Sequence, residues 1–215
     1  TDVTGVQTCA FRSITAYHME HGIRAESEDD MRFVMAQCEK RGVRCVVERA
    51  DVPQLTVERR VSIETAARDA RYAFLDAQDV DFMATAHQMD DMAETVLLNL
   101  IRGSGLAGLT GIPEQRGKYI RPLLQVSRRE IEAYARENGI EHVHDATNED
   151  TGYTRNYVRH ELLPRMAQVN ENASDNIARA AALLAEDEAA LNDMARRSGC
   201  IEKGSEGTEI GRAHV

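Results

Sequence analysis

The sequence is poor in the residues on which several classes of protein depend. It has no tryptophan, 5% aromatic residues, four prolines and four cysteines among 215 residues. These shortages exclude a disulfide-stapled scaffold and a collagen-like or proline-rich low-complexity chain. No apolar run approaches the ~20 residues that a membrane-spanning helix needs, so we expect no membrane partner. The remaining composition, 42% apolar and 29% charged, is typical of a soluble globular protein.

Basic residues are also few. Lysine and arginine number 26 against 36 acidic residues, which gives a formal net charge of −10. Nucleic acids attract basic surfaces, so an acidic balance is mild evidence against such a partner.

The cysteines predict neither a disulfide nor a metal site. Apart from Cys9, close to the first residue, they are Cys38, Cys45 and Cys200, and none has CxxC spacing. Cys38 falls on a helix-like face and Cys45 in a strand-like run, so we expect buried thiols. Free thiols fit a reducing compartment, and we expect the protein in the cytoplasm.

Both ends of the chain look foreign to the rest. Residues 1–13 and 209–215 resemble the translation of a short-read sequencing adapter, and the alternative is a pair of ordinary disordered termini. We therefore expect the intervening residues to be an internal piece of a longer protein.

Strand and helix signals alternate along the chain. Strand-like runs lie at residues 14–17, 43–47, 80–86 and 119–124, and a connection begins at Val52-Pro53. Helical patterns, with capping residues at Ser27, Ser62 and Ser127, cover residues 27–41, 62–77, 90–102, 127–138 and 171–197. This order predicts an α/β fold, in which a parallel twisted sheet has helices on both faces and a long linker helix follows.

The densest group of ionisable residues follows the third predicted strand. The segment His87-Gln-Met-Asp90-Asp91-Met-Ala-Glu94-Thr95 places Asp91, Glu94 and Thr95 on one helix face, at the strand end where open α/β sheets bind ligands. Neighbouring carboxylates repel each other, so a cation is expected beside them: a metal, an ammonium group or an arginine. For Asp90, stabilisation of the helix N-terminus is an equally good explanation. One histidine with carboxylates does not make a structural zinc set, and we assign no metal site.

Two further segments carry arginines suited to anions. Arg102-Gly103-Ser104-Gly105 combines a guanidinium with flexible backbone donors that suit a phosphate or a ribose, although an ordinary glycine helix cap explains it equally well. Arg155 and Arg159, which flank Asn156, are four residues apart and would project together from a helix as an anion-binding pair. Here the alternative is a solvated surface pair.

Six segments in order resemble the N-terminal catalytic domain of the tRNA(Ile)-lysidine synthetases, in the PP-loop ATP pyrophosphatase superfamily. One is Ala84-Thr-Ala-His87 through Thr95, and another is Ser62-Ile-Glu64-Thr-Ala-Ala-Arg68-Asp-Ala-Arg71-Tyr72. The other four lie at residues 18–24, 97–105, 121–124 and 145–164. The family's Ser-Gly-Gly-x-Asp-Ser pyrophosphate loop, expected ahead of Ile14, is not in the sequence.

The resemblance implies a domain organisation. Residues 14–168 would be the PP-loop catalytic domain without its first strand and phosphate loop. Residues 169–200 would be a helical linker toward an absent C-terminal domain. The chain as it stands is then expected to be inactive.

The resemblance also implies an ATP-dependent ligase. ATP would adenylate carbon 2 of the wobble cytidine in an isoleucine tRNA, and free L-lysine would displace AMP to form lysidine, with Mg²⁺ accompanying the triphosphate. His87, Asp91 and Glu94 would be catalytic, with Asp91 and Glu94 holding the lysine. Phosphates of ATP or RNA would contact Arg102, Gly103, Ser104, Arg155, Asn156 and Arg159.

Some questions stay open at this point. Glu64, Arg68 and Arg71 share one helix face, where an ion-paired structural role is as plausible as substrate contact. A tRNA thiolase of the same superfamily is an alternative, but it would need paired cysteines near the site. A non-catalytic RNA-binding fragment is a second alternative function. The sequence also leaves open whether the protein forms a homodimer.

Overall fold

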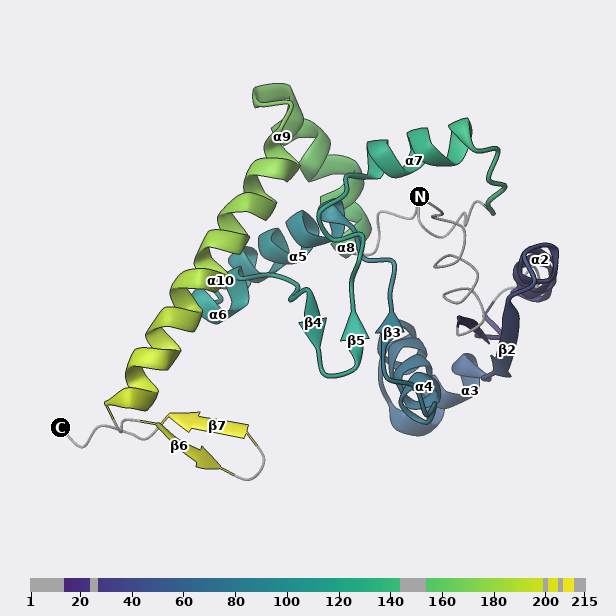
Figure 1. Ribbon diagram of the computed structural model, residues 1–215, viewed down its shortest axis with the longest axis horizontal. Helices are drawn as coiled ribbons and strands as arrows, with labels where there is room; N and C mark the ends of the chain where they lie inside the picture. The colour runs from purple at the N-terminus through teal and green to yellow at the C-terminus, as the bar shows by residue number, and fades with distance from the viewer. Residues whose placement is uncertain (1–13, 24–26, 144–153, 199–200, 205–206, 211–215) are drawn as a thin grey trace, which may run out of the picture. The chain divides into compact units, whose positions relative to one another are not determined.

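The computed structural model describes residues 14–23, 27–143, 154–198, 201–204 and 207–210, and for the last two ranges only the backbone (Figure 1). The chain divides into two compact units, residues 1–81 and residues 82–215.

The first unit is built on a parallel strand pair. β1 (Thr15–Glu20) runs beside β2 (Arg44–Arg49), in a register that sets Thr15 opposite Arg44. The connection is α2 (Ser27–Lys40), which has three acidic residues in its first turn and ends before Gly42, at a φ of 63°. Acidic side chains favour the positive end of a helix, and glycine adopts the left-handed conformation without strain. The predicted strand–helix–strand unit is therefore confirmed.

Two helices follow β2. α3 (Val52–Arg59) occupies the segment that we predicted as a connection. Its cap is Asp51, which accepts a hydrogen bond from the Gln54 amide at 2.9 Å, and Pro53 lies in the first turn, where no amide donor is needed. α4 (Ile63–Asp76) begins after Ser62, as predicted.

The second unit has a short mixed sheet. β3 (Met83–Ala84) pairs in parallel with β5 (Tyr119–Ile120), and β4 (Gln115–Arg116) pairs with β5 in antiparallel. Both parallel strands are shorter than predicted. Residues around Val80 turn before β3, and a turn closed by the Leu124 amide on the Arg121 carbonyl ends β5.

Helices make up most of the rest of this unit. α5 (Met89–Ile101) and the short α6 (Leu106–Leu109) follow β3, and α7 (Arg128–Glu137) begins with the predicted capping box of Ser127 and Glu130. Then come α8 (Thr154–Tyr157), a π-helical turn η2 (Val158–Leu162), α9 (Leu163–Val169) and α10 (Ala173–Arg197). A hairpin of β6 (Ile201–Gly204) and β7 (Gly207–Ile210) follows.

The core of the second unit forms where α5 meets the later helices. Ala93 and Leu97 of α5 pack with Val158 of η2 and Leu163 of α9, and a second cluster joins Met92 to Leu124 and Ala181.

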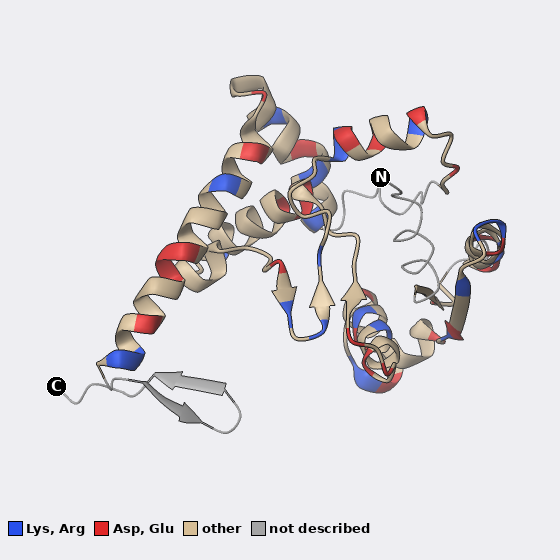
Figure 2. Cartoon of the chain, viewed as in Figure 1, with Lys and Arg blue, Asp and Glu red and all other residues tan. Residues whose placement is uncertain are grey.

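The predicted long helix is present as α10. Ala173 and Ala181 are buried on it, whereas Leu183, Leu191 and Met194 are more than half exposed. Charges of both signs are interspersed along it (Figure 2). No helix in the described part of the chain is long and apolar enough to cross a bilayer.

Candidate functional site

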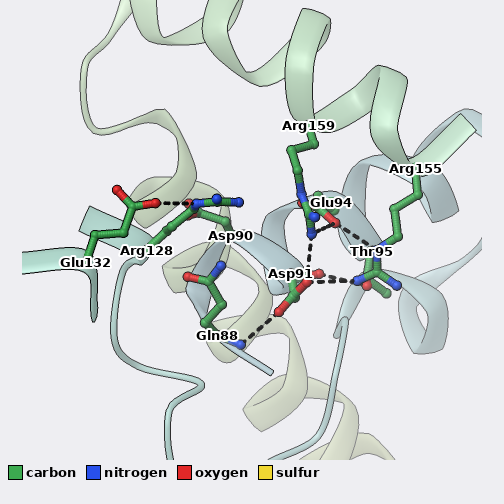
Figure 3. Close-up of polar contacts among 9 residues, drawn as sticks. All are labelled: Gln88, Asp90, Asp91, Glu94, Thr95, Arg128, Glu132, Arg155 and Arg159. Carbon is green, nitrogen blue, oxygen red and sulfur yellow. Dashed lines mark hydrogen bonds and ion pairs between the residues drawn. The ribbon is translucent and has the colours of Figure 1, made fainter. Parts of the chain in front are cut away.

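Four charged residues from two distant parts of the sequence meet beside the start of α5 (Figure 3). Arg155 donates from Nε to Glu94 Oε2 at 2.7 Å and from Nη2 to Asp91 Oδ1 at 3.3 Å. Arg159 donates from Nε to Glu94 Oε1 at 2.6 Å, and from Nη2 to Asp91 Oδ1 and Glu94 Oε2, each at 3.2 Å. We call these four residues the charge cluster.

The charge cluster is largely withdrawn from solvent. The Glu94 side chain is 0% exposed, Asp91 16%, Arg159 21% and Arg155 36%. A buried carboxylate is stable only when it is paired and hydrogen-bonded, which the two guanidiniums provide. Of the cations that the sequence analysis left open, arginine is the one that the structure places against the carboxylates.

Local folding explains the convergence. Asp91 and Glu94 share a helix face because they are three residues apart, and Arg155 and Arg159 project together across a four-residue spacing. Between the arginines lies Val158, 1% exposed and packed on Ala93 of α5. Val158 begins the π-helical turn, a feature that is often found at functional sites.

Electrostatics keep Arg159 charged. Burial lowers its pKa, but hydrogen bonding to Glu94 and the charges of Glu94 and Asp91 raise it, and the net pKa lies above the ordinary value for arginine. The guanidinium is therefore a fixed positive charge.

Asp91 also organises the helix on which it lies. Its Oδ2 accepts a hydrogen bond from the Gln88 amide at 3.0 Å, so the carboxylate caps the N-terminus of α5 while Oδ1 faces the arginines. Thr95, predicted on the same face, donates its hydroxyl to the Asp91 carbonyl at 2.8 Å. The Thr95 hydroxyl proton is therefore already engaged in a hydrogen bond within α5.

Asp90 points to a different neighbour. Its Oδ2 accepts from the Arg128 amide at the start of α7, at 3.3 Å. This contact favours the structural explanation that the sequence analysis left open for Asp90, although helix α7 rather than α5 is the one it caps.

His87 is held by the end of β3. The Thr85 amide donates to the Ile120 carbonyl at 3.0 Å, and the Thr85 hydroxyl lies 2.9 Å from His87 Nδ1. Sequence reasoning missed Thr85, although a hydroxyl two residues before a histidine on an extended segment is a recognisable signal.

The Arg102 loop lies at the other end of α5. Gly103, at a φ of 76°, donates its amide to the Leu100 carbonyl, and Ser104 donates to the Asn99 carbonyl, so the loop forms a glycine cap. Arg102 follows Glu94 by eight positions along α5 and its C-cap, a rise of about 12 Å. The structure therefore does not bring Arg102, Gly103 and Ser104 into the charge cluster. Arg102 is exposed, and Asn156 lies half-buried on α8 beside Arg155.

In the first unit, Arg71 contacts a histidine. Its Nη2 donates to His21 Nε2 at 3.1 Å, and Arg68 lies over the Tyr72 ring, 5.5 Å from its centroid. Among the described residues neither arginine forms an ion pair with Glu64, and both explanations for these three residues stay predictions. Burial, then the Arg71 charge, lowers the pKa of His21.

The two described cysteines are partly exposed, not buried as predicted. Burial and a hydrogen bond with Cys38 raise the pKa of the Cys45 thiol. No group of three or more metal-ligating side chains gathers anywhere in the described ranges. Residues 24 and 145–153 of the resembling segments fall outside those ranges.

Comparison with known proteins identifies the class. A family model described as the PP-loop domain matches residues 4–166, and the chain belongs to this family.

The similar curated proteins narrow the resemblance. The tRNA(Ile)-lysidine synthase of Thermosipho africanus is 44% identical over 162 residues, covering 74% of this chain and 38% of that protein. That of Pseudomonas aeruginosa is 40% identical over 192 residues, covering 86% and 42%. The chain thus spans about two fifths of the length of the curated relatives it matches. The resemblance read from the six segments is confirmed.

A solved structure shows the same fold. The U34-tRNA thiolase NcsA from Methanococcus maripaludis, determined with its [4Fe-4S] cluster, superimposes with a TM-score of 0.61 at 18% identity, covering 84% of this chain and 66% of that one. At this identity the likeness concerns the fold alone, and it confirms the predicted α/β class.

Proposed function

We propose that this chain is the catalytic part of an ATP-dependent ligase that joins lysine to the wobble cytidine of an isoleucine tRNA. The identity to tRNA(Ile)-lysidine synthases over most of the chain carries the proposal. The charge cluster supports it, because carboxylates and arginines at the carboxyl end of a parallel strand suit a cationic amino acid and phosphates.

The proposed reaction has two steps. The O2 oxygen of the cytidine attacks the α-phosphate of ATP, and pyrophosphate leaves. The ε-amine of lysine then forms a bond to carbon 2 and loses a proton, while AMP departs with the oxygen. Adenylation is needed because the carbonyl oxygen is otherwise a poor leaving group.

The carboxylates have unequal roles in this scheme. Asp91 is the accessible one, at 16% exposure, and we assign it the first contact with the lysine ammonium and the uptake of its proton. Glu94 is enclosed between the two guanidiniums, so it reaches lysine only when one of them moves. His87, oriented by Thr85, would position the base or polarise the nucleotide.

Two separate groups would contact phosphates. Arg155 and Arg159, with Asn156 beside them, would face the nucleotide. The exposed Arg102 with Gly103 and Ser104, at the far end of α5, would suit an RNA backbone phosphate.

Mg²⁺ does not fit the charge cluster, because both carboxylates there are already neutralised by arginines. We propose that any Mg²⁺ arrives with the triphosphate and is held by phosphate oxygens and water. The remaining proposals are a cytoplasmic location, a longer protein that includes a tRNA-binding part, and a homodimer as an open alternative.

The test is lysine-dependent AMP release with isoleucine tRNA, by the protein extended with the sequence that flanks it in its gene. We expect release that requires lysine and a wobble cytidine, and loss of release in Glu94→Ala. AMP release independent of lysine would refute the ligase. Sulfur transfer to the tRNA would support the thiolase, and tRNA binding without ATP turnover would support a non-catalytic role.

A further inference from the structure

The charge cluster has no net charge. Two carboxylates face two guanidiniums, and every carboxylate oxygen accepts a hydrogen bond from the protein: three from the arginines, and Asp91 Oδ2 from the Gln88 amide. Within these four residues a lysine ammonium finds no excess of negative charge, and each carboxylate oxygen already accepts a hydrogen bond. The same neutrality weakens attraction for a phosphate.

The two arginines are not held equally. Arg159 makes three hydrogen bonds to the carboxylates and is 21% exposed. Arg155 makes two, one of them at 3.3 Å, and is 36% exposed, the largest fraction in the charge cluster. Arg155 is therefore the member that can leave at least cost, while Arg159 continues to neutralise part of the buried Glu94.

We propose that Arg155 exchanges between the carboxylates and a phosphate of the substrate, so that phosphate binding opens the lysine site. This inference rests on the proposed function. Once Arg155 pairs with the phosphate, Asp91, Glu94 and Arg159 carry a net charge of −1, and two carboxylate oxygens lose a donor. Lysine then finds a net negative charge that it lacks beforehand, beside two oxygens that each keep a single hydrogen bond, from Arg159.

The exchange has a thermodynamic consequence. If phosphate increases the affinity for lysine by some factor, lysine must increase the affinity for phosphate by the same factor. We expect a factor of about ten, within the usual range of coupling between sites. Binding is thereby cooperative, because each substrate alone binds weakly and the two together bind well.

The direct test is calorimetric titration of the full chain with lysine, at constant ionic strength, alone and with tripolyphosphate, ATP or a short RNA stem-loop. We expect about tenfold tighter lysine binding with tripolyphosphate and with ATP. Tightening by the RNA alone would instead identify a backbone phosphate as the anion. The same lysine affinity in all four titrations, or no lysine binding in any, would overturn the proposal.

Arg155→Gln tests the same point by removing the charge. Lysine should bind this variant without phosphate about as tightly as it binds the unaltered chain with phosphate, and added phosphate should have little further effect. Arg165→Gln is the matched control, because Arg165 lies further along the same helical segment and pairs with Glu161 at the surface. It should keep the full phosphate effect, and circular dichroism melts should show both variants folded. Should Arg155→Gln fail to fold, the titrations of the unaltered chain still decide the question.

The inference and the proposed function fail separately. Lysidine formation by the extended protein, with a lysine affinity indifferent to phosphate, would reject the exchange and keep the ligase. Phosphate-dependent lysine binding without lysidine formation would do the reverse.

Discussion

Replacing Glu94 with glutamine should destabilise the protein severely. The substitution keeps the shape of the side chain but removes its charge, at a position where the carboxylate is 0% exposed and accepts three hydrogen bonds from two arginines. Arg155 and Arg159 are then left with Asp91 as their shared counterion within the charge cluster. Breaking a buried ion pair by removing one partner costs about 3–5 kcal/mol.

The assay is urea denaturation of Glu94→Gln beside the unaltered chain. The matched control is Glu161→Gln, which removes a carboxylate that is 41% exposed and pairs with Arg165 at 3.1 Å. Exposed pairs contribute about 0–1 kcal/mol, so the control should leave the free energy of unfolding nearly unchanged. Equal, small losses in the two variants would show that burial does not make Glu94 essential to the charge cluster.

A double variant sharpens the result. Glu94→Gln with Arg159→Gln removes both a buried negative and a buried positive charge. It should be less destabilised than the sum of the two single variants, by about 0.5–3 kcal/mol for residues in contact. Strict additivity would mean that the two side chains do not interact in solution.

The remaining predictions concern other parts of the fold. Thr85→Val should shift the pH profile of AMP release by the extended protein and change the chemical shift of His87 Nδ1, because this nitrogen loses its contact with the Thr85 hydroxyl, while Thr85→Ser should restore both; an unshifted profile would contradict the positioning role. Stability should fall as the pH drops below about 6.5, the ordinary pKa of histidine, because burial lowers the pKa of His21 and His18 and keeps both neutral in the folded state while the unfolded chain takes up protons; His21→Gln should reduce this slope, measured by denaturation between pH 5 and 7.5. Gly111→Ala should lower the melting temperature, because Gly111 has a φ of 71° and an added Cβ would collide with Met92 Sδ; an unchanged melting temperature would show that the turn relaxes freely.

Local chemistry explains which parts of the fold were predictable. The helix starts at Ser62 and Ser127 are predictable because side chains there accept hydrogen bonds from backbone amides within three residues. At the second start, Glu130 completes a capping box with Ser127. α3 was missed because Val52-Pro53 was read as the start of a connection, although a proline in a first turn after a capping Asp51 also predicts a helix. The lengths of β3 and β5 depend on turns at their ends, which the apolar pattern does not encode.

The candidate site was predictable in its parts but not in its pairing. The sequence showed that Asp91 and Glu94 need a cation and that Arg155 and Arg159 project together as a pair suited to an anion. The structure shows that the arginine pair is the counterion of the carboxylate pair. This pairing depends on packing between segments more than 60 residues apart, and local sequence patterns carry no information on such packing. The helix rise along α5 likewise separates Arg102 from the cluster, although the resemblance groups them by function.

The most direct measurement of the central claim is mass spectrometry of nucleosides from isoleucine tRNA, after incubation of the extended protein with ATP and isotopically labelled lysine. We expect the wobble cytidine to gain the labelled lysine, and the Glu94→Ala variant to leave it unmodified. A wobble cytidine that stays unmodified with the unaltered protein, while ATP is consumed, would show that the protein is not a lysidine-forming ligase.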